Sequence, residues 1–334
     1  METPSRPREP LFFERIGKQT VWGGRALARD LRWTPPFDGP LGETWELSDV
    51  EGMVTVVRGG AWAGTSLRQL MERHGRHLLG RSQPGPGGRF PLLVKFLEAA
   101  QDLSVQVHPS NASAGEGRCG KTECWTFLDG SLDGAEVWCG LAEGAGAAAF
   151  RAAAGTAEVV PLLRRHPAKR GEFLFVPPGQ PHAIRAGVRL LEIQQTCDTT
   201  YRLYDWDRKG LDGQPRELHL EQGLAVLDDA SPCPGPFAPD YRATEDGCEA
   251  ALLVHCEAFL ARALRLPVAH LFRPRSYAHV MAVVRGSGQL VDPAGASPRR
   301  ALRFGDVFLV PADVGPIRLE PDDEGLELIE ATAL

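Results

Sequence analysis

Short runs of β-branched and aromatic residues, each closed by turn residues, recur along this chain and constrain its fold more than any other feature. The runs are Met53–Arg58, Leu92–Leu97, Leu103–Val107, Cys124–Leu128, Phe173–Val176 and Val188–Gln194. Residues of these types favour strands, and turn residues such as Asp129-Gly130 and Gly179 end them. The density of such runs predicts a mainly β barrel or sandwich rather than alternating βαβ units.

Helical patterns are few. Residues Thr65–Leu79 repeat apolar side chains at helical spacing, and Thr65 is placed to cap the first turn. The alanine-rich stretch 146–165 and the segment Leu218–Leu227 are the other helix candidates. We therefore expect a β protein with a few short helices.

An internal echo predicts two related barrels. Residues Gly171–His182 read GEFLFVPPGQPH and residues Gly305–Pro316 read GDVFLVPADVGP, with a proline at the same offset in each. The segments before them, Glu123–Gly130 and His279–Gly286, also match each other. The proline-rich, acidic stretch 232–246 reads as a linker, so we expect a first barrel within residues 1–235 and a second within 236–334.

Bulk properties exclude several classes of protein. The 334 residues carry a formal net charge of -6, which argues against a nucleic-acid partner, where a basic surface is expected. The N-terminus is polar, and no stretch approaches the roughly 20 apolar residues of a membrane span. Seven cysteines without a Cys-x-x-Cys pair indicate reduced thiols in a cytoplasm rather than a disulfide framework. A soluble cytoplasmic protein, as a monomer or small homo-oligomer, fits these bounds.

Four side chains form a candidate metal set. Gln106 and His108 are two residues apart, so on a strand they project from the same face. Glu123 begins a second strand, and His182 follows a tight Pro-Gly turn at the start of another. Two imidazoles with oxygen ligands suit zinc or another first-row divalent metal, and antiparallel barrel strands can bring all four to one interior point.

The sequence blocks around these residues resemble a known family. Residues Gly171–His182 fit G-x5-P-x-G-x2-H, the second signature of cupins, whose fold is a jelly-roll β-barrel. The blocks LLVKFLEAAQDLSVQVHPSN, GKTECWTFLDG, GEFLFVPPGQPHAI and TTYRLYDWDR resemble the type I mannose-6-phosphate isomerases in their short bacterial form. VWGG at Val21–Gly24 and GETWELS at Gly42–Ser48 resemble the N-terminal blocks of that family.

The resemblance implies a fold, an activity and a set of site residues. It implies two cupin-type barrels and a zinc-dependent isomerase of carbohydrate metabolism that interconverts mannose 6-phosphate and fructose 6-phosphate through an enediolate. It also implies one zinc per chain and a role for each of ten residues: Gln106, His108, Glu123 and His182 as zinc ligands; Arg202, Glu192 and Lys121 in catalysis; Lys95, Ser104 and Trp22 in substrate binding. Either Glu192 or a zinc-bound water could be the base.

The second repeat departs from the metal pattern. Pro316 stands where His182 stands in the first repeat, and His279 stands at the place of Glu123. One candidate ligand without partners does not make a site, so we expect a degenerate C-terminal barrel without metal.

Three alternatives remain open at this stage. A non-catalytic cupin that binds a sugar phosphate would keep the metal without turnover. A nucleotide hydrolase is the second alternative, because residues Gly115–Thr122, GEGRCGKT, match the phosphate-binding loop G-x4-G-K-[ST]. That loop needs a strand before it and a helix after it. An iron oxygenase would prefer more histidine ligands.

Overall fold

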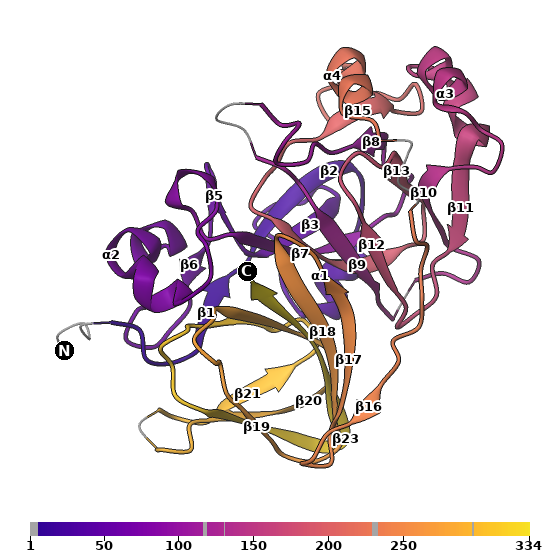
Figure 1. Ribbon diagram of the computed structural model, residues 1–334. Coiled ribbons are helices and arrows are strands. Elements are labelled where there is room, and N and C mark those ends of the chain that lie inside the picture. Colours follow the sequence, from indigo (N-terminus) through magenta and orange to yellow (C-terminus); the bar gives the residue numbers. More distant parts are fainter. Residues whose placement is uncertain (1–5, 116–118, 130, 229–232, 296) are drawn as a thin grey trace. The chain divides into compact units, whose positions relative to one another are not determined.

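The computed structural model describes residues 6–115, 119–129, 131–228, 233–295 and 297–334 (Figure 1). The described residues fall into two compact units, each built from segments that are distant in the sequence. Unit 1 lies within Met1–Ile16, Glu46–Leu93 and Pro239–Leu334, and unit 2 lies within Gly17–Trp45 and Val94–Ala238.

Strands in two sheets dominate unit 2. The first sheet has the order β11 (Leu163–Pro167), β10 (Glu136–Leu141), β13 (His182–Ile184), β8 (Val105–Val107), β15 (Tyr201–Tyr204). The second has the order β12 (Phe173–Val176), β9 (Glu123–Phe127), β14 (Arg189–Gln195), β7 (Leu92–Glu98), β3 (Leu41–Leu47), β2 (Ile16–Gly24). The helical segments of this unit are short: α1 (Ala26–Asp30), α3 (Ala147–Ala153), the 3-10 turn η2 (Ala157–Leu162) and α4 (Leu220–Ala225).

One large sheet forms most of unit 1. Its order is β16 (Arg242–Ala243), β17 (Glu249–His255), β18 (Phe259–Leu266), β23 (Ile317–Ala333), β20 (His279–Val291), β22 (Val307–Val310), β1 (Leu11–Glu14), β6 (Val56–Val57), with β19 (His270–Phe272) beside β23 and β21 (Arg300–Arg303) beside β20. The remaining elements are the hairpin of β4 (Asp49–Val50) and β5 (Met53–Val54), the helix α2 (Leu67–Leu79) and the 3-10 turn η1 (Pro86–Gly88). The prediction of a mainly β fold with few helices is confirmed.

The predicted strands exist because their apolar faces have a core to cover. In unit 2, Trp125 of β9, Leu174 of β12 and Leu190 of β14 are fully buried in one cluster. Each such side chain contributes roughly 1.5–3 kcal/mol by leaving water. Of the predicted runs, Met53–Arg58 is divided between β5 and β6.

The helices differ in detail from the sequence prediction. Ser66, not Thr65, caps α2: its hydroxyl accepts a hydrogen bond from the Gln69 amide, and the Gln69 side chain accepts one from the Ser66 amide. The alanine-rich stretch is not one helix, because Gly155 adopts φ +89° between α3 and η2 and Pro161 follows.

The internal echo has a structural counterpart in strand pairing. In unit 2, β9 lies between β12 and β14, with Glu123 opposite Val176 and Gln194. In unit 1, β20 lies between β22 and β23, with His279 opposite Val310 and Thr332. The two repeats therefore share not only a sequence pattern but also the register in which the matching strands pair.

Four cysteines contradict the expectation of reduced thiols throughout. Disulfides join Cys119 to Cys197 and Cys139 to Cys233, across 78 and 94 residues of sequence. Separations of this length give no sequence signal, because only the strand pairing of unit 2 brings the Cα atoms to 5.8 and 6.0 Å.

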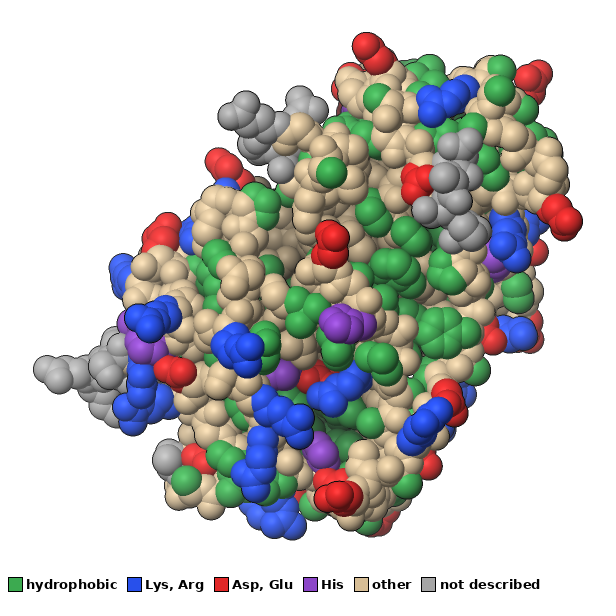
Figure 2. Space-filling model, viewed as in Figure 1, with side chains coloured by type: hydrophobic (Ala, Val, Ile, Leu, Met, Phe, Trp, Pro, Cys, Tyr) green, Lys and Arg blue, Asp and Glu red, His purple; other side chains and the backbone are tan. Residues whose placement is uncertain are grey.

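The described helices are all too short or too polar to cross a membrane. On the face in Figure 2, basic and acidic side chains are interspersed, including over the strands of unit 1. In unit 1, ion pairs such as Arg265–Glu327 and Arg285–Glu327 join neighbouring strands.

Candidate active site

Three buried side chains of unit 2 converge on one point. His108 follows β8, Glu123 begins β9 and His182 begins β13, and their exposed fractions are 1%, 0% and 1%. The Nε2 atoms of both histidines lie 3.4 Å from oxygens of Glu123. One candidate ligand atom from each residue lies within 4.8 Å of the others, so the structure brings together three of the four predicted ligands as a group able to hold a metal ion.

Both histidines are oriented to present Nε2 inward. His108 donates from Nδ1 to the Thr199 carbonyl at 3.0 Å, and His182 donates from Nδ1 to the Gln180 carbonyl at 2.9 Å. Such hydrogen bonds fix the tautomer and leave an Nε2 lone pair for a ligand. Burial lowers the pKa of His182 to about 4 and that of His108 well below its usual range, helped by the charge of Lys121. Both rings are therefore neutral, as metal ligation requires.

Glu123 is a buried carboxylate with little stabilisation from the protein. Among the described residues, neither of its oxygens accepts a hydrogen bond of good geometry, although Lys121 Nζ lies 2.9 Å from Oε2. Burial raises its pKa to about 7 against the opposing effect of Lys121. A bound cation would favour the ionised form, so this orphaned carboxylate between two neutral imidazoles fits a divalent metal.

Gln106 connects the metal group to the predicted catalytic arginine. It lies on the central strand β8, opposite His182 of β13 on one side and Arg202 of β15 on the other. Its Nε2 is 3.2 Å from His182 Nε2, and its Oε1 accepts a hydrogen bond from Ser104 at 3.3 Å. The fourth predicted ligand thus touches the group, with Ser104 beside it.

A cavity of about 660 Å³ opens beside this group. Gln106 and Lys121 belong to its wall, together with five other predicted residues: Trp22, Lys95, Ser104, Glu192 and Arg202. All the predicted catalytic and substrate-binding residues therefore line a single pocket, beneath which His108, Glu123 and His182 are buried. Trp22 is 4% exposed and packs into the core that supports this wall.

Lys95 is engaged by two buried carboxylates. Its Nζ lies 3.1 Å from Glu192 and 3.5 Å from Glu43, and it also stands over the Trp45 ring. Burial alone would raise the pKa of Glu43, but the charges of Lys95, Lys18 and Lys121 and the hydrogen bond from Trp45 together outweigh it and hold that pKa at about 2. The pKa of Glu192 is lowered as well: burial opposes this, but the charges of Lys95 and Lys121 together outweigh it.

Arg202 points a partly unsatisfied guanidinium into the pocket region. Its Nη1 donates to the Glu217 carbonyl at 2.8 Å, and its backbone amide donates to His219 Nδ1. Its Nε is buried, and no described residue accepts a hydrogen bond from it. Burial lowers its pKa, and the nearby Arg216 adds to this effect.

Several wall residues escaped the sequence analysis. Lys18, Asp198, Arg216 and His219 line the pocket, and Glu43 and Trp45 support Lys95 from the GETWELS block. Glu43 and Trp45 could have been found from that block, which resembles the family. Lys18 and Arg216 lie in segments whose composition does not indicate a functional site.

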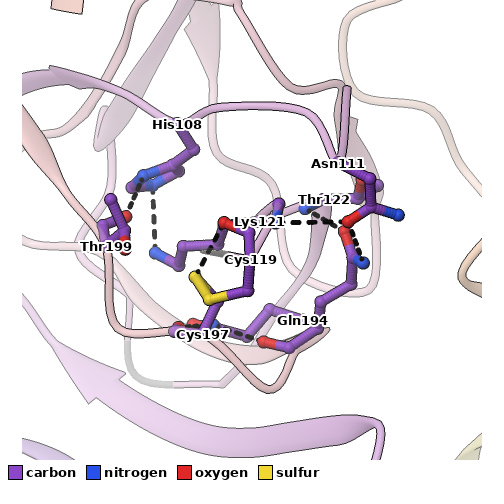
Figure 3. Close-up of a disulfide and its surroundings, with 10 residues drawn as sticks. His108, Asn111, Cys119, Lys121, Thr122, Gln194, Cys197 and Thr199 are labelled. Atoms are coloured by element: carbon purple, nitrogen blue, oxygen red, sulfur yellow. Dashed lines mark hydrogen bonds between the residues drawn. A yellow bond between two sulfur atoms is a disulfide. The ribbon is translucent and has the colours of Figure 1, made fainter. Parts of the chain in front are cut away.

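A disulfide stands next to the metal group (Figure 3). Cys119 lies two residues before Lys121, whose Nζ donates to His108 Nε2 at 2.9 Å. Cys197 lies two residues before Thr199, the acceptor for the other nitrogen of His108. The Cys197 carbonyl accepts a hydrogen bond from Gln194 at 2.6 Å. The bond thus ties together the two segments that flank His108.

The motif around Lys121 does not fold as a nucleotide-binding loop. Strand β9 begins at Glu123, directly after Lys121 and Thr122, where that loop requires a helix. Residues 116–118 of the motif lie outside the described residues.

Comparison with known proteins decides the family. A sequence model for the catalytic domain of type I phosphomannose isomerase matches residues 11–123. Mannose-6-phosphate isomerase ManA of Bacillus subtilis is 37% identical over 315 residues, which cover 93% of this chain and 96% of that protein. The chain belongs to the type I mannose-6-phosphate isomerase family. Its relative from Streptococcus mutans is 35% identical and covers 95% of this chain and 96% of its own.

Solved structures of the family share the fold. The mannose 6-phosphate isomerase structure from Bacillus subtilis superposes with a TM-score of 0.86 at 30% identity, over 96% of this chain and 99% of that one. A structure described as mannose 6-phosphate isomerase bound with zinc and yttrium has a TM-score of 0.73 at 18% identity, over 97% and 99%. Membership of the mannose-6-phosphate isomerase family confirms the assignment made from the sequence blocks, and with it the expectation of an isomerase.

Proposed function

We propose that the pocket of unit 2 interconverts mannose 6-phosphate and fructose 6-phosphate with one zinc ion bound by Gln106, His108, Glu123 and His182. The observation that carries this proposal is the buried His-Glu-His group, which adjoins a cavity lined by Glu192 and Arg202. A buried site with two neutral imidazoles and a carboxylate that accepts no hydrogen bond of good geometry from the described residues matches the ligands that zinc prefers. The structure described with zinc and yttrium, which has the same fold, is consistent with this choice.

Zinc in this site supplies a positive charge at the sugar oxygens on which negative charge develops during enolisation. The remaining steps fall to the residues of this chain. Glu192 is ionised, lines the cavity and is positioned by Lys95 and by a 3.2 Å hydrogen bond from the Trp125 indole. It accepts the proton from C2, which leaves an enediolate, and returns it to C1. The hydroxyl proton of O2 moves to O1 in the same conversion, so that no net proton is gained or lost.

Arg202 and Lys121 stabilise the enediolate electrostatically. Arg202 lies opposite Gln106 on the neighbouring strand, so its charge is beside the metal group throughout the reaction. Lys121 Nζ is 2.9 Å from both His108 and Glu123 and also reaches the cavity wall. Cations already fixed in place act without reorganisation at the moment of reaction.

The anionic phosphate is held by the rest of the wall. Ser104, Trp22 and Lys95 remain our proposed substrate-binding residues, and Lys18 and Arg216 add positive charge to the same cavity. Because Lys95 already faces two carboxylates, its main effect is to keep Glu192 ionised. Binding the phosphate far from C1 and C2 orients the reacting carbons.

The finer architecture belongs to the same proposal. Each repeat is a cupin-type jelly roll, the catalytic part lies within residues 1–235, and the C-terminal part, 236–334, is degenerate and non-catalytic. The protein acts in the cytoplasm as a monomer or small homo-oligomer. In the C-terminal repeat, both ring nitrogens of His279 are hydrogen-bonded, one to Glu330 at 2.7 Å and one to the Pro274 carbonyl at 2.6 Å.

A paired measurement tests the function. Zinc content and conversion of mannose 6-phosphate to fructose 6-phosphate are measured before and after chelation and again after zinc is restored. Activity that falls with the metal and returns with it supports the proposal. Binding of mannose 6-phosphate without turnover of any hexose phosphate would overturn it and leave a sugar-phosphate-binding protein instead.

A further inference from the structure

Unit 1 contains a second group of metal-binding side chains that the isomerase reaction does not use. Asp246, Cys248 and His270 each place one ligand atom within 4.8 Å of the others. Asp246 and Cys248 flank Gly247, whose φ of +83° turns the chain between β16 and β17. His270 begins β19, so the group connects a hairpin turn to a separate strand.

The turn that carries two of these residues is well ordered by its own hydrogen bonds. The Thr244 hydroxyl donates to Asp246 Oδ1 at 2.5 Å, and the amide of Gly247 donates to the Thr244 carbonyl at 3.1 Å. The Thr244 amide in turn donates to the Cys248 carbonyl at 2.8 Å. The backbone that carries Asp246 and Cys248 is therefore fixed before any ion arrives, which lowers the cost of binding.

The chemistry of the group suits a borderline divalent cation. It offers a thiol, an imidazole and a carboxylate, which are the three ligand types of protein zinc sites. Asp246 Oδ2 and His270 Nδ1 form a hydrogen bond at 2.5 Å, which metal binding would replace. Ligands bound to one tetrahedral zinc at roughly 2.0–2.3 Å would lie about 3.3–3.6 Å apart, so binding requires a shift of about 1 Å at exposed side chains.

Burial divides the group into an anchored and an accessible part. Cys248 is 1% exposed and packs in the core of unit 1, whereas the side chains of Asp246 and His270 are 38% and 19% exposed. An ion can therefore reach the thiol from solvent past the carboxylate and the imidazole. The thiol donates weakly to the Val268 carbonyl at 3.6 Å, a contact that ligation would replace.

We propose that Asp246, Cys248 and His270 bind a divalent zinc-like cation that ties the β16–β17 turn to β19. The fourth position is open to water. The site is independent of the isomerase pocket, since none of its residues belongs to unit 2. Its role is structural: an ion that binds only the folded chain shifts the equilibrium towards that state.

The thiol also gives the site a specific signal. Burial, with the charge of Asp246, raises the pKa of Cys248 to about 11, so without a metal the thiol is protonated. Metal binding must displace that proton and create a metal–thiolate bond. The metal group of the isomerase pocket contains no sulfur ligand, so a thiolate signal does not come from that group.

Cobalt(II) titration of metal-depleted full-length protein is the test. A sulfur-to-cobalt charge-transfer band in the near ultraviolet, with saturation at one equivalent for this band, is expected for the wild type. The band should disappear in Cys248→Ser. In Asp246→Asn and in His270→Ala, the apparent affinity for cobalt(II) should fall at least tenfold. Cys256→Ser, which alters another unpaired thiol of unit 1, should keep the band.

Two further readouts keep the proposal open to refutation. Isomerase activity should be unchanged in His270→Ala, while added zinc should raise the unfolding temperature of the wild type more than that of this surface variant. A wild type without the charge-transfer band, or a band of equal strength in the Cys248→Ser and wild-type proteins, would overturn the proposal. If Cys248→Ser fails to fold, the Asp246→Asn and His270→Ala titrations decide alone.

Discussion

Gln106 of β8 and Arg202 of β15 are direct partners across two antiparallel strands. On the other side of β8, the same glutamine faces His182 of β13, with 3.2 Å between the two side chains. Since neighbouring strands are about 4.8 Å apart, one row across the sheet carries a metal-group histidine, its neighbouring amide and the arginine. The charge beside the metal group is therefore set by strand register and not by a mobile loop.

This row predicts a separation of metal binding from catalysis at Arg202. Arg202→Ala should lower kcat about 10²- to 10³-fold, because it removes a preorganised charge near the developing enediolate. Zinc content should stay at the wild-type level, since the guanidinium contacts Glu217 rather than the metal group. Steady-state kinetics and metal analysis of the same samples check this. Arg164→Ala, an exposed change in the same unit, is the matched control, and wild-type turnover in Arg202→Ala would refute the assignment.

Removal of His182 should affect both properties together. His182→Ala takes away one of two imidazoles that face Glu123, so zinc content and turnover should both fall to background. Dialysis against zinc buffer followed by metal analysis and the isomerase assay measures the effect. His166 is also buried in unit 2 but belongs to no metal group, so His166→Ala should keep its zinc even if it loses stability. Full zinc occupancy in His182→Ala would count against the ligand set.

The disulfide beside His108 should contribute to stability and to the metal site. Closing 78 residues of chain by the Cys119–Cys197 bond restricts the unfolded state by about 4 kcal/mol. The double variant Cys119→Ala/Cys197→Ala should lose much of this free energy of unfolding. Zinc affinity should also fall about 10- to 100-fold, because the segments that carry Lys121 and Thr199 are no longer joined.

Denaturant unfolding and zinc titration of the double variant provide both numbers. Cys256→Ala, at a half-buried unpaired cysteine, is the control for loss of a thiol as such. Equal unfolding midpoints for the wild type with and without reductant would show that the bond makes no contribution.

The Glu43–Lys95 pair predicts how the free energy of unfolding falls at acidic pH. The folded-state pKa of Glu43 is about 2 against an ordinary value of 4.5, so its ionised form favours folding at neutral pH. That contribution, about 3 kcal/mol, is fully present above pH 4.5 and is lost as the pH falls from 4.5 towards 2. Glu43→Gln should therefore be less stable at pH 7, and its stability should fall less steeply than that of the wild type over this window.

Urea unfolding at a series of pH values tests this pair. Glu143→Gln, an exposed change in unit 2, should follow the wild-type curve. Parallel acid limbs for Glu43→Gln and the wild type would exclude Glu43 as the source of the pH dependence.

The amino-acid sequence determined the strand-forming runs, the repeat and the residues of the site. Runs of β-branched and aromatic residues and the turn residues that end them are local properties, so β9, β12 and β14 could be predicted from short windows. The spacing of Gln106 and His108, together with family blocks, predicted four ligands, of which the structure brings three into one group able to hold a metal ion. The exact ends of the helices were predicted wrongly where neighbouring residues offer competing signals. Ser66 caps α2 in place of Thr65, and Gly155 ends α3 within the alanine-rich stretch.

The tertiary structure alone decided which distant side chains meet. No local signal pairs Cys119 with Cys197, Lys95 with Glu43 and Glu192, or Asp246 with His270. Those contacts depend on strand register, which is a cooperative outcome of burying many apolar faces at once. The same register lets Lys95 and Lys121 together counter the burial of Glu43 and Glu192, so the ionisation state of the site is a property of the fold rather than of any sequence motif.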